Sequence, residues 1–304
     1  RSSGMVVSLS GICGGTDVQG HRIDAPSRCA NGFAHFFHRM QFMPKAAGEA
    51  SNVTRSLHRA VTLLRLLASH TRTGWRLSDL AQQTTLDPAT VHRLLSSLCD
   101  EGLAARVAGS RRYTLGSLAF EIGIAAAPYF DLAKPSHARL AALARELRGT
   151  VFLKIRSGME SVCLARHDGV QRVASLLLDV GGRRPLCLTA GGVAMVVPLP
   201  RAKQLAIEAH NRAIIERQDP RRWRAVSRML ARSRPRGFAL NLGDIATGIC
   251  AIGVPLPSGD QAPVASLTLA LAGPILHDDQ AGAVAQRLRE VATELSPLLA
   301  HMRL

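Results

Sequence analysis

A group of polar side chains within residues 88–101 has the types and spacing needed to read base edges in DNA. On a helix, Arg93 lies opposite an apolar stripe whose members recur at i, i+3, i+4 and i+7. A guanidinium group can pair with a guanine edge through two hydrogen bonds, so Arg93 is the predicted base-reading residue. The stripe consists of Val91, Leu94, Leu95 and Leu98. Further candidates for contacts to bases or phosphates are Thr90, His92 and Ser96.

The residues that flank this segment are typical of helix ends. Asp87 is a preferred N-cap residue, and Pro88 suits the first helical position because its missing N–H group would have no partner there. Gly102 follows Glu101, and a glycine just past a helix favours its termination. The sequence therefore predicts a helix from Pro88 to Glu101.

Two further helices are predicted before this one. An amphipathic helix covers residues 55–69, and Ser78 caps a short helix that ends at Gln83. A turn at residues 84–86 would join the short helix to the one that begins at Pro88. The faces expected to point inward hold Leu57, Ala60, Val61, Leu64, Leu67 and Ala68 in the first helix, and Leu80 and Ala81 in the second.

A small hairpin is predicted to follow the three helices. Apolar residues alternate on either side of a turn at residues 108–110. Arg111 and Arg112 lie near its tip, where they could follow a phosphate backbone or enter a minor groove. Together these elements predict a winged helix-turn-helix over residues 52–116, in which Ser78 is a further candidate for a DNA contact.

The rest of the chain predicts a linker helix and a second domain. Residues 117–131 form the linker, with a helix that ends before Pro128. Tight turns then join short strands in residues 132–304, and such hairpins indicate an antiparallel sheet within an α+β domain that binds a small ligand. The expected helices are 134–148, 193–199, 202–217, 221–233 and a last helix capped by Asp278; the expected strands are 150–155, 161–166, 170–178, one near Phe238, 250–256 and 264–271, with a loop at 181–190.

The composition favours an anionic partner without locating its binding site. The 304 residues carry a net charge of +16. Residues 53–116 hold nine arginines against four acidic residues, whereas residues 201–236 hold eleven basic residues against three acidic ones. Net charge alone would therefore point away from the predicted DNA-reading helix.

One alternative is that residues 221–236 form a second surface for nucleic acid or an acidic partner. The simpler interpretation is a solvated arginine face, because one helical stripe packs inward: Trp223, Val226, Met229 and Leu230.

The six cysteines are scattered without the spacing of a disulfide or metal framework, which is typical of reduced thiols in a cytoplasmic protein. No run of about eighteen uncharged apolar residues predicts a membrane span. We predict neither a metal nor a cofactor. Residues 1–51 are expected to form a loose or disordered extension, and its Cys and His residues lack the close pair of a zinc site.

An enzyme is the rival class of function. Its nucleophile would be Cys163, Cys187 or Cys250 in the second domain, with His167 as the base. No local motif supports this hypothesis, and a cysteine on an apolar strand usually packs in the core. A catalytic cysteine should be partly exposed with a histidine in reach.

Two segments of the second domain resemble a known family. The segments are GGRRPLCLTAGGVAMV at residues 181–196 and RGFALNLGDIATGICAIGVPL at residues 236–256. Both segments follow the winged helix-turn-helix and the linker, and this order of segments is similar to that of the IclR-type bacterial transcriptional regulators, named for the isocitrate lyase regulator. The resemblance covers residues 52–304. It implies a GAF-like C-terminal effector domain, operator DNA and a small organic acid as partners, and homodimers through the DNA-binding modules that often pair into homotetramers.

The resemblance also implies the residues of an effector pocket. The family commonly has Lys where Val193 stands, an acidic residue where Asn241 stands and often Cys where Ala251 stands. Loss of a carboxylate and a thiol changes the polarity of the pocket, although Asn241 can still donate and accept hydrogen bonds. A regulator that works without a ligand, with a degenerate pocket, is therefore a second alternative. The implied residues are Leu186, Thr189, Ala190, Gly191, Gly192, Asn241, Ala251, Thr268 and Ala270.

Overall fold

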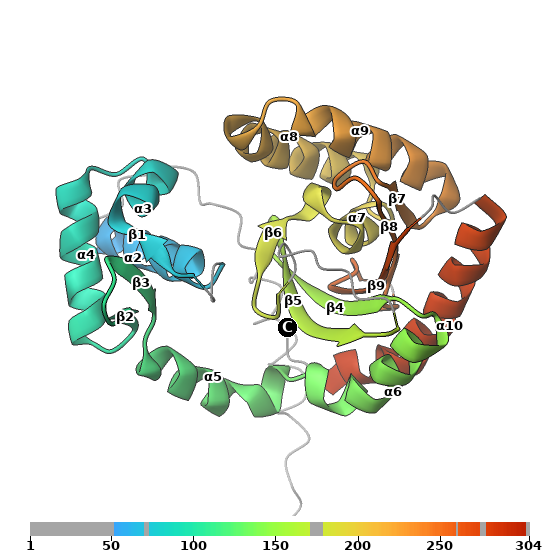
Figure 1. Cartoon of the computed structure of the whole chain (residues 1–304), viewed down its shortest axis with the longest axis horizontal. Helices are drawn as coiled ribbons and strands as arrows, with labels where there is room; N and C mark the ends of the chain where they lie inside the picture. The colour runs from blue at the N-terminus through green and yellow to red at the C-terminus, as the bar shows by residue number, and fades with distance from the viewer. Residues whose placement is uncertain (1–51, 70–72, 171–178, 260, 274–277, 302–304) are drawn as a thin grey trace, which may run out of the picture. The chain divides into compact units, whose positions relative to one another are not determined.

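The computed structural model describes residues 52–69, 73–170, 179–259, 261–273 and 278–301 (Figure 1). The expected extension at residues 1–51 and the expected strand at 170–178 therefore lie outside the described residues, apart from residue 170. The N-terminal folded part consists of α2 (Asn52–Leu67), β1 (Trp75–Arg76), α3 (Leu77–Thr84), α4 (Pro88–Asp100), β2 (Ala104–Arg106) and β3 (Arg112–Leu115). Its three strands form an antiparallel sheet in the order β1-β3-β2. The two-residue strand β1 was not predicted.

The ends of α4 confirm the predicted signals. The Asp87 side chain accepts a hydrogen bond from the Thr90 N–H at 2.9 Å, and Pro88 is the first helical residue. Gly102 has φ +70°, a conformation that glycine adopts without steric cost, and it directly follows the C-cap Glu101. The local chemistry of the chain thus fixes where this helix begins and ends.

The three helices enclose a core in which α2 uses only part of the predicted face: Leu67 is buried and Ala60 and Leu64 pack against the core as predicted. Leu63 and Leu67 are buried, whereas Leu57 is 64% exposed and Val61 37% exposed. The expected inward face of α2 is thus wrong in these positions, because apolar residues occur around much of this helix and periodicity cannot tell which side packs. In α3, Leu80 and Ala81 are buried as predicted, but the N-cap position is Arg76 and not Ser78.

The linker helix α5 (Ser117–Phe130) is longer than predicted. It continues through Pro128, because a proline in the last turn removes only one backbone hydrogen bond close to the helix end. The Asp131 N–H then closes the helix by donating to the Ala127 carbonyl at 2.8 Å.

The C-terminal folded part is the predicted α+β domain. Its elements are α6 (Ala133–Glu146), β4 (Thr150–Ser157), β5 (Glu160–Asp168), β6 (Arg183–Pro185), η1 (Leu186–Leu188), α7 (Ala190–Val196), α8 (Arg201–Gln218), α9 (Arg222–Ser233), η2 (Arg234–Arg236), β7 (Ala239–Leu242), β8 (Ile249–Pro255), β9 (Ala265–Ala272) and α10 (Asp278–His301). The expected loop at 181–190 is partly wrong, because it contains β6 and η1. In α10, Leu288, Val291 and Leu295 are buried.

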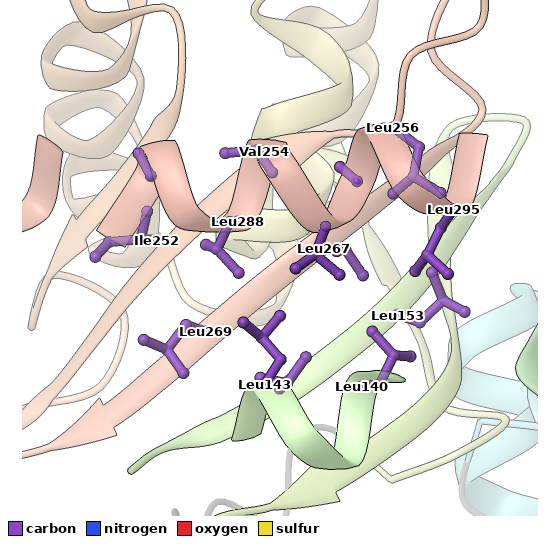
Figure 2. Packing of buried hydrophobic residues seen from close by; sticks show 14 of the residues in the cluster. Leu140, Leu143, Leu153, Ile252, Val254, Leu256, Leu267, Leu269, Leu288 and Leu295 are labelled. Carbon is purple, nitrogen blue, oxygen red and sulfur yellow. The ribbon is translucent and has the colours of Figure 1, made fainter. Parts of the chain in front are cut away.

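Six strands form one antiparallel sheet in the order β6-β5-β4-β9-β8-β7, which confirms the predicted pairing. Helices α6 and α10 cover one face, where leucine and valine side chains interlock (Figure 2). Helices α7, α8 and α9 pack with η1 on the other side of the sheet (Figure 1). We call this second side the α7 face. Because both faces are covered, strand side chains of either orientation are removed from water.

Candidate functional site

The outward face of α4 carries the predicted DNA-reading residues. His92, Arg93 and Ser96 are exposed, and Val91 and Leu95 on the opposite side are fully buried. Thr90 is half-buried at the helix start. Hydrogen bonds from its hydroxyl and its N–H lower the pKa of the Asp87 carboxyl, so Thr90 supports the cap of the helix. The helix therefore presents a polar ridge while its apolar stripe anchors it to the core.

The two arginines of the predicted hairpin tip have different surroundings. Arg111 is exposed in the turn between β2 and β3. Arg112 is half-buried, and its Nη1 donates to the Gly74 carbonyl at 2.9 Å. Ser78, another candidate, lies exposed in the first turn of α3 and donates to Asp79 Oδ1 at 3.2 Å. Arg111 is thus the arginine of this pair that is available for a phosphate contact.

The predicted pocket residues of the sheet lie beside one another on adjacent strands. Asn241 on β7 is paired with Ala251 on β8, and Ala251 is paired with Ala270 on β9. Thr268 is two residues from Ala270 and points to the same side. Strand register therefore brings these four predicted residues together on the α7 face.

The beginning of α7 is pressed against these residues. The Thr189 hydroxyl accepts a hydrogen bond from the Gly192 N–H at 3.1 Å and caps the helix. A methyl group at Gly191 would lie 2.5 Å from Thr268 Oγ1, and one at Gly192 would collide with the Leu186 carbonyl. A methyl group at Gly253, on β8, would likewise lie 2.6 Å from the Ala190 carbonyl. Helix α7 can approach the sheet this closely only because glycine stands at these three positions. The approach brings the predicted pocket residues at the start of α7 next to those of the sheet.

Asn241 is occupied by contacts within the protein. Its Nδ2 donates to the Ile249 carbonyl and its Oδ1 accepts from the Ile245 N–H, both at 3.3 Å. These bonds hold the two ends of the loop that joins β7 to β8. The amide that stands where the family commonly has a carboxylate therefore has a structural role in this chain.

Sequence reasoning missed Lys154 and Ser266, which lie on the same face. Lys154 on β4 is opposite Ser266 on β9, and their exposed fractions are 2% and 0%. A methyl group at Gly191 would lie 2.8 Å from Lys154 Cδ and 3.1 Å from Ser266 Oγ. A signal for Lys154 was present in the segment TVFLKIRS, where a lysine interrupts a run of apolar residues of the kind found in buried strands.

The cysteines named in the enzyme hypothesis are buried. Burial raises the pKa of the Cys163 thiol, and it raises the pKa of Cys187 to about 12. His167 stacks its ring edge against His137, with ring centres 4.8 Å apart, on the side of β5 that faces α6. A reactive cysteine needs a stabilised thiolate, and these surroundings favour the neutral thiol.

Three arginines of the arginine-rich segment are paired with acidic residues. Arg228 and Arg232 both contact the Asp244 carboxylate, and Arg234 contacts Glu208 at 2.7 Å. Val226, Met229 and Leu230 of the predicted packing stripe are buried, and Trp223 is partly buried. The packing stripe of the simpler interpretation is thus confirmed, whereas the expected solvated arginine face is correct only in part, because three of its arginines form ion pairs within the domain.

No helix in the described ranges has the length and apolar character needed to cross a bilayer. Within the same ranges, no three His, Cys, Asp or Glu side chains gather as metal ligands would.

A winged helix-turn-helix joined to a separate α+β domain is an architecture typical of transcriptional regulators. The family model of the IclR helix-turn-helix domain matches residues 56–108, and that of the bacterial transcriptional regulator IclR C-terminal domain matches residues 125–297. The chain therefore belongs to the IclR family of bacterial transcriptional regulators.

Relatives and solved structures agree with this assignment. The chain is 29% identical to the glycerol operon regulatory protein of Streptomyces coelicolor, over 70% of this chain and 83% of the relative. Its fold is similar to that of a putative IclR-type regulator from Silicibacter sp. TM1040, with a TM-score of 0.64, 23% identity and coverage of 80% and 96% of the two chains. It is also similar to an IclR homologue from Microbacterium hydrocarbonoxydans complexed with 4-hydroxybenzoate, with a TM-score of 0.55, 20% identity and coverage of 82% and 99%.

Proposed function

We propose that this regulator recognises an operator through the outward face of α4, and that a small organic acid bound in its C-terminal domain changes the affinity for that operator. The observation that carries the first part is the exposed position of Arg93 on a helix whose other side is fully buried. In this proposal Arg93 reads a base, with Thr90, His92 and Ser96 beside it. Arg111 contacts a phosphate, and Ser78 and Arg112 support the surface.

The test of the DNA-reading role compares specific with nonspecific binding. An operator is first selected from random duplexes with the full-length protein, and affinities are then measured by fluorescence anisotropy. Arg93→Ala should weaken operator binding by about 1–3 kcal/mol while changing the affinity for unrelated DNA far less. Arg217→Ala on α8 removes an equally exposed arginine from the other domain and should leave both affinities unchanged. Equal losses on both DNAs for Arg93→Ala would contradict a base-reading role.

The proposal includes a homodimer formed near the DNA-binding module. Large apolar side chains are exposed on α5 and on α2, and the four on the short helix α5 are concentrated as on an interaction surface. Two copies joined there would bring two α4 helices to successive major grooves, as operators with two half-sites require. The exposed residues are Phe120, Ile122, Ile124 and Phe130 on α5, and Leu57 and Val61 on α2.

Effector binding is supported by the assembly of the implied pocket residues where α7 meets the sheet. The related fold from Microbacterium hydrocarbonoxydans was solved with 4-hydroxybenzoate, an aromatic acid. An effector alters operator affinity only if it binds the two arrangements of the protein with different affinities. A panel of small organic acids should therefore include one that both stabilises the folded protein and shifts its operator affinity. If no acid in the panel stabilises the folded protein or changes operator binding, the result favours the alternative of a regulator that works without a ligand.

A further inference from the structure

Two buried hydroxyl groups on the α7 face, those of Ser266 and Thr268, have no hydrogen-bond partner among the described residues, and they lie beside the buried side chain of Lys154. Lys154, Ser266 and Thr268 are 2%, 0% and 3% exposed. The hydroxyl oxygens of Ser266 and Thr268 make no hydrogen bond within the described part of the chain. The electrostatic neighbours of the Lys154 ammonium group are the Cys163 thiol and the Arg184 guanidinium, and neither is a carboxylate.

The Ser266 and Thr268 hydroxyl oxygens and the Lys154 Cδ lie around one position beside Gly191. Lys154 and Ser266 are directly opposed across β4 and β9, and Thr268 is the next residue of β9 on the same side. All three lie near the position that a methyl group on Gly191 would occupy. The Phe152 ring forms one apolar wall, with its centre 5.9 Å from Lys154 Nζ.

An unpaired ammonium group in such surroundings is costly, because burial removes its hydration without an ion pair in exchange. Burial is the main reason that the pKa of Lys154 falls to about 8, and Arg184 acts in the same direction. Buried polar groups in native proteins nearly always have partners, so two hydroxyls without one, beside a buried ammonium group that has no carboxylate neighbour, form an arrangement suited to a polar ligand. A positive charge beside two hydroxyl donors suits an anion.

We propose that Lys154 recognises the charge of the effector: its ammonium group binds a carboxylate of the ligand, and the hydroxyls of Ser266 and Thr268 donate hydrogen bonds to the same carboxylate. This inference rests on the proposed function of the domain and specifies the group that the ligand must carry. Lys154 is outside the residues implied by family resemblance, so it is a specificity-determining residue of this chain.

The first experiment measures thermal unfolding of the full-length protein with small carboxylates. Sodium formate, acetate and pyruvate at roughly 100 mM are compared with sodium chloride at equal ionic strength. At least one carboxylate should raise the Tm of the wild-type protein and of Lys203→Met, which removes an exposed lysine on α8. Lys154→Met should lose this rise, with an affinity at least about tenfold weaker. An equal rise in wild type and Lys154→Met overturns the inference.

A second experiment needs no substitution at Lys154. The wild-type protein is labelled with ¹³Cε-lysine, and the pKa of each of its four lysines is measured by NMR titration with and without the same carboxylates. A bound carboxylate should raise the pKa of Lys154 and leave that of Lys203 unchanged, because an opposite charge favours the ammonium form. A Lys154 pKa that no carboxylate moves overturns the inference.

The two proposals fail in different ways. If an acid shifts operator affinity but leaves the Lys154 pKa unchanged, the effector function stands and the role of Lys154 is wrong. If carboxylates raise the Lys154 pKa while no acid that binds changes operator affinity, Lys154 is an anion site and the regulatory function is wrong.

Discussion

Arg112 Nη1 donates a hydrogen bond to the Gly74 carbonyl, and this bond ties β3 to the residue that precedes β1. Neighbouring Arg111 is exposed in the turn. The two arginines should therefore respond differently to alanine. Arg111→Ala should weaken binding to operator and unrelated DNA alike, and should reduce the slope of log affinity against log salt by about 1.

Arg112→Ala should instead lower the Tm of the protein, because it leaves the buried side of the hairpin without this bond. Fluorescence anisotropy over a series of salt concentrations and thermal unfolding separate the two effects. An unchanged salt slope in Arg111→Ala would remove the phosphate contact from the proposal.

Lys154 should make the stability of the unliganded protein depend on alkaline pH. Burial lowers the pKa of Lys154 in the folded protein to about 8, from the 10.5 that is usual for a lysine in water. Below pH 8 the Lys154 amine is protonated in both the folded and the unfolded protein, so burial of its charge lowers the free energy of unfolding by the full amount. Between pH 8 and 10.5 the unfolded chain binds more protons, so stability rises with pH, by about 3 kcal/mol over the whole window.

Urea unfolding between about pH 7.5 and 9.5 measures this rise, with each variant compared at the same pH. Lys154→Met lacks the titrating group and should be the more stable protein at neutral pH, with a flatter pH profile. Lys203→Met should follow the wild type. If Lys154→Met is less stable than the wild type at neutral pH, the charge of Lys154 is compensated within the protein and this prediction is wrong.

Asn241 should act as a clamp on the loop between β7 and β8. Asn241→Ala removes bonds to Ile245 and Ile249 and should lower the free energy of unfolding by about 1–3 kcal/mol. Asn241→Asp restores the carboxylate common in the family but loses the Nδ2 donor, so it too should be less stable. Urea unfolding compares the variants, and a fully stable Asn241→Asp would show that the donor is dispensable.

Ile124 on α5 should contribute to the proposed homodimer. It is 55% exposed, and a glutamate there would place a charge in an apolar interface. Ile124→Glu should yield monomers in size-exclusion chromatography with light scattering, and should weaken operator binding. Leu205 on α8, 49% exposed, provides the matched control Leu205→Glu, which should keep the wild-type mass. If Ile124→Glu forms dimers as stable as those of the wild type, the homodimer interface does not include Ile124.

The DNA-binding module could be predicted because independent local signals agree. Asp87, Pro88, Gly102 and the apolar stripe all specify the same helix, and its burial pattern follows the stripe. The inward face of α2 could not be predicted in the same way. Leu57 and Leu63 are equally apolar, and only tertiary packing decides which of them is covered.

The interior site shows a different limit of sequence reasoning. Alternation in β4 places Phe152 and Lys154 on one side of the strand, but both sides of this sheet are covered by helices. Polarity therefore cannot reveal which side meets solvent. The missing partners of Lys154 and Ser266 become evident only when strand register and the approach of Gly191 are known.

The six-stranded sheet ends in two short strands, β6 with three residues and β7 with four. Strand β6 consists of two arginines and a proline, which lacks a backbone donor and cannot extend a hydrogen-bonded ladder. Repulsion between like charges further discourages two such borders from meeting. The β6 edge of the sheet is thereby a poor template for a further strand from another molecule.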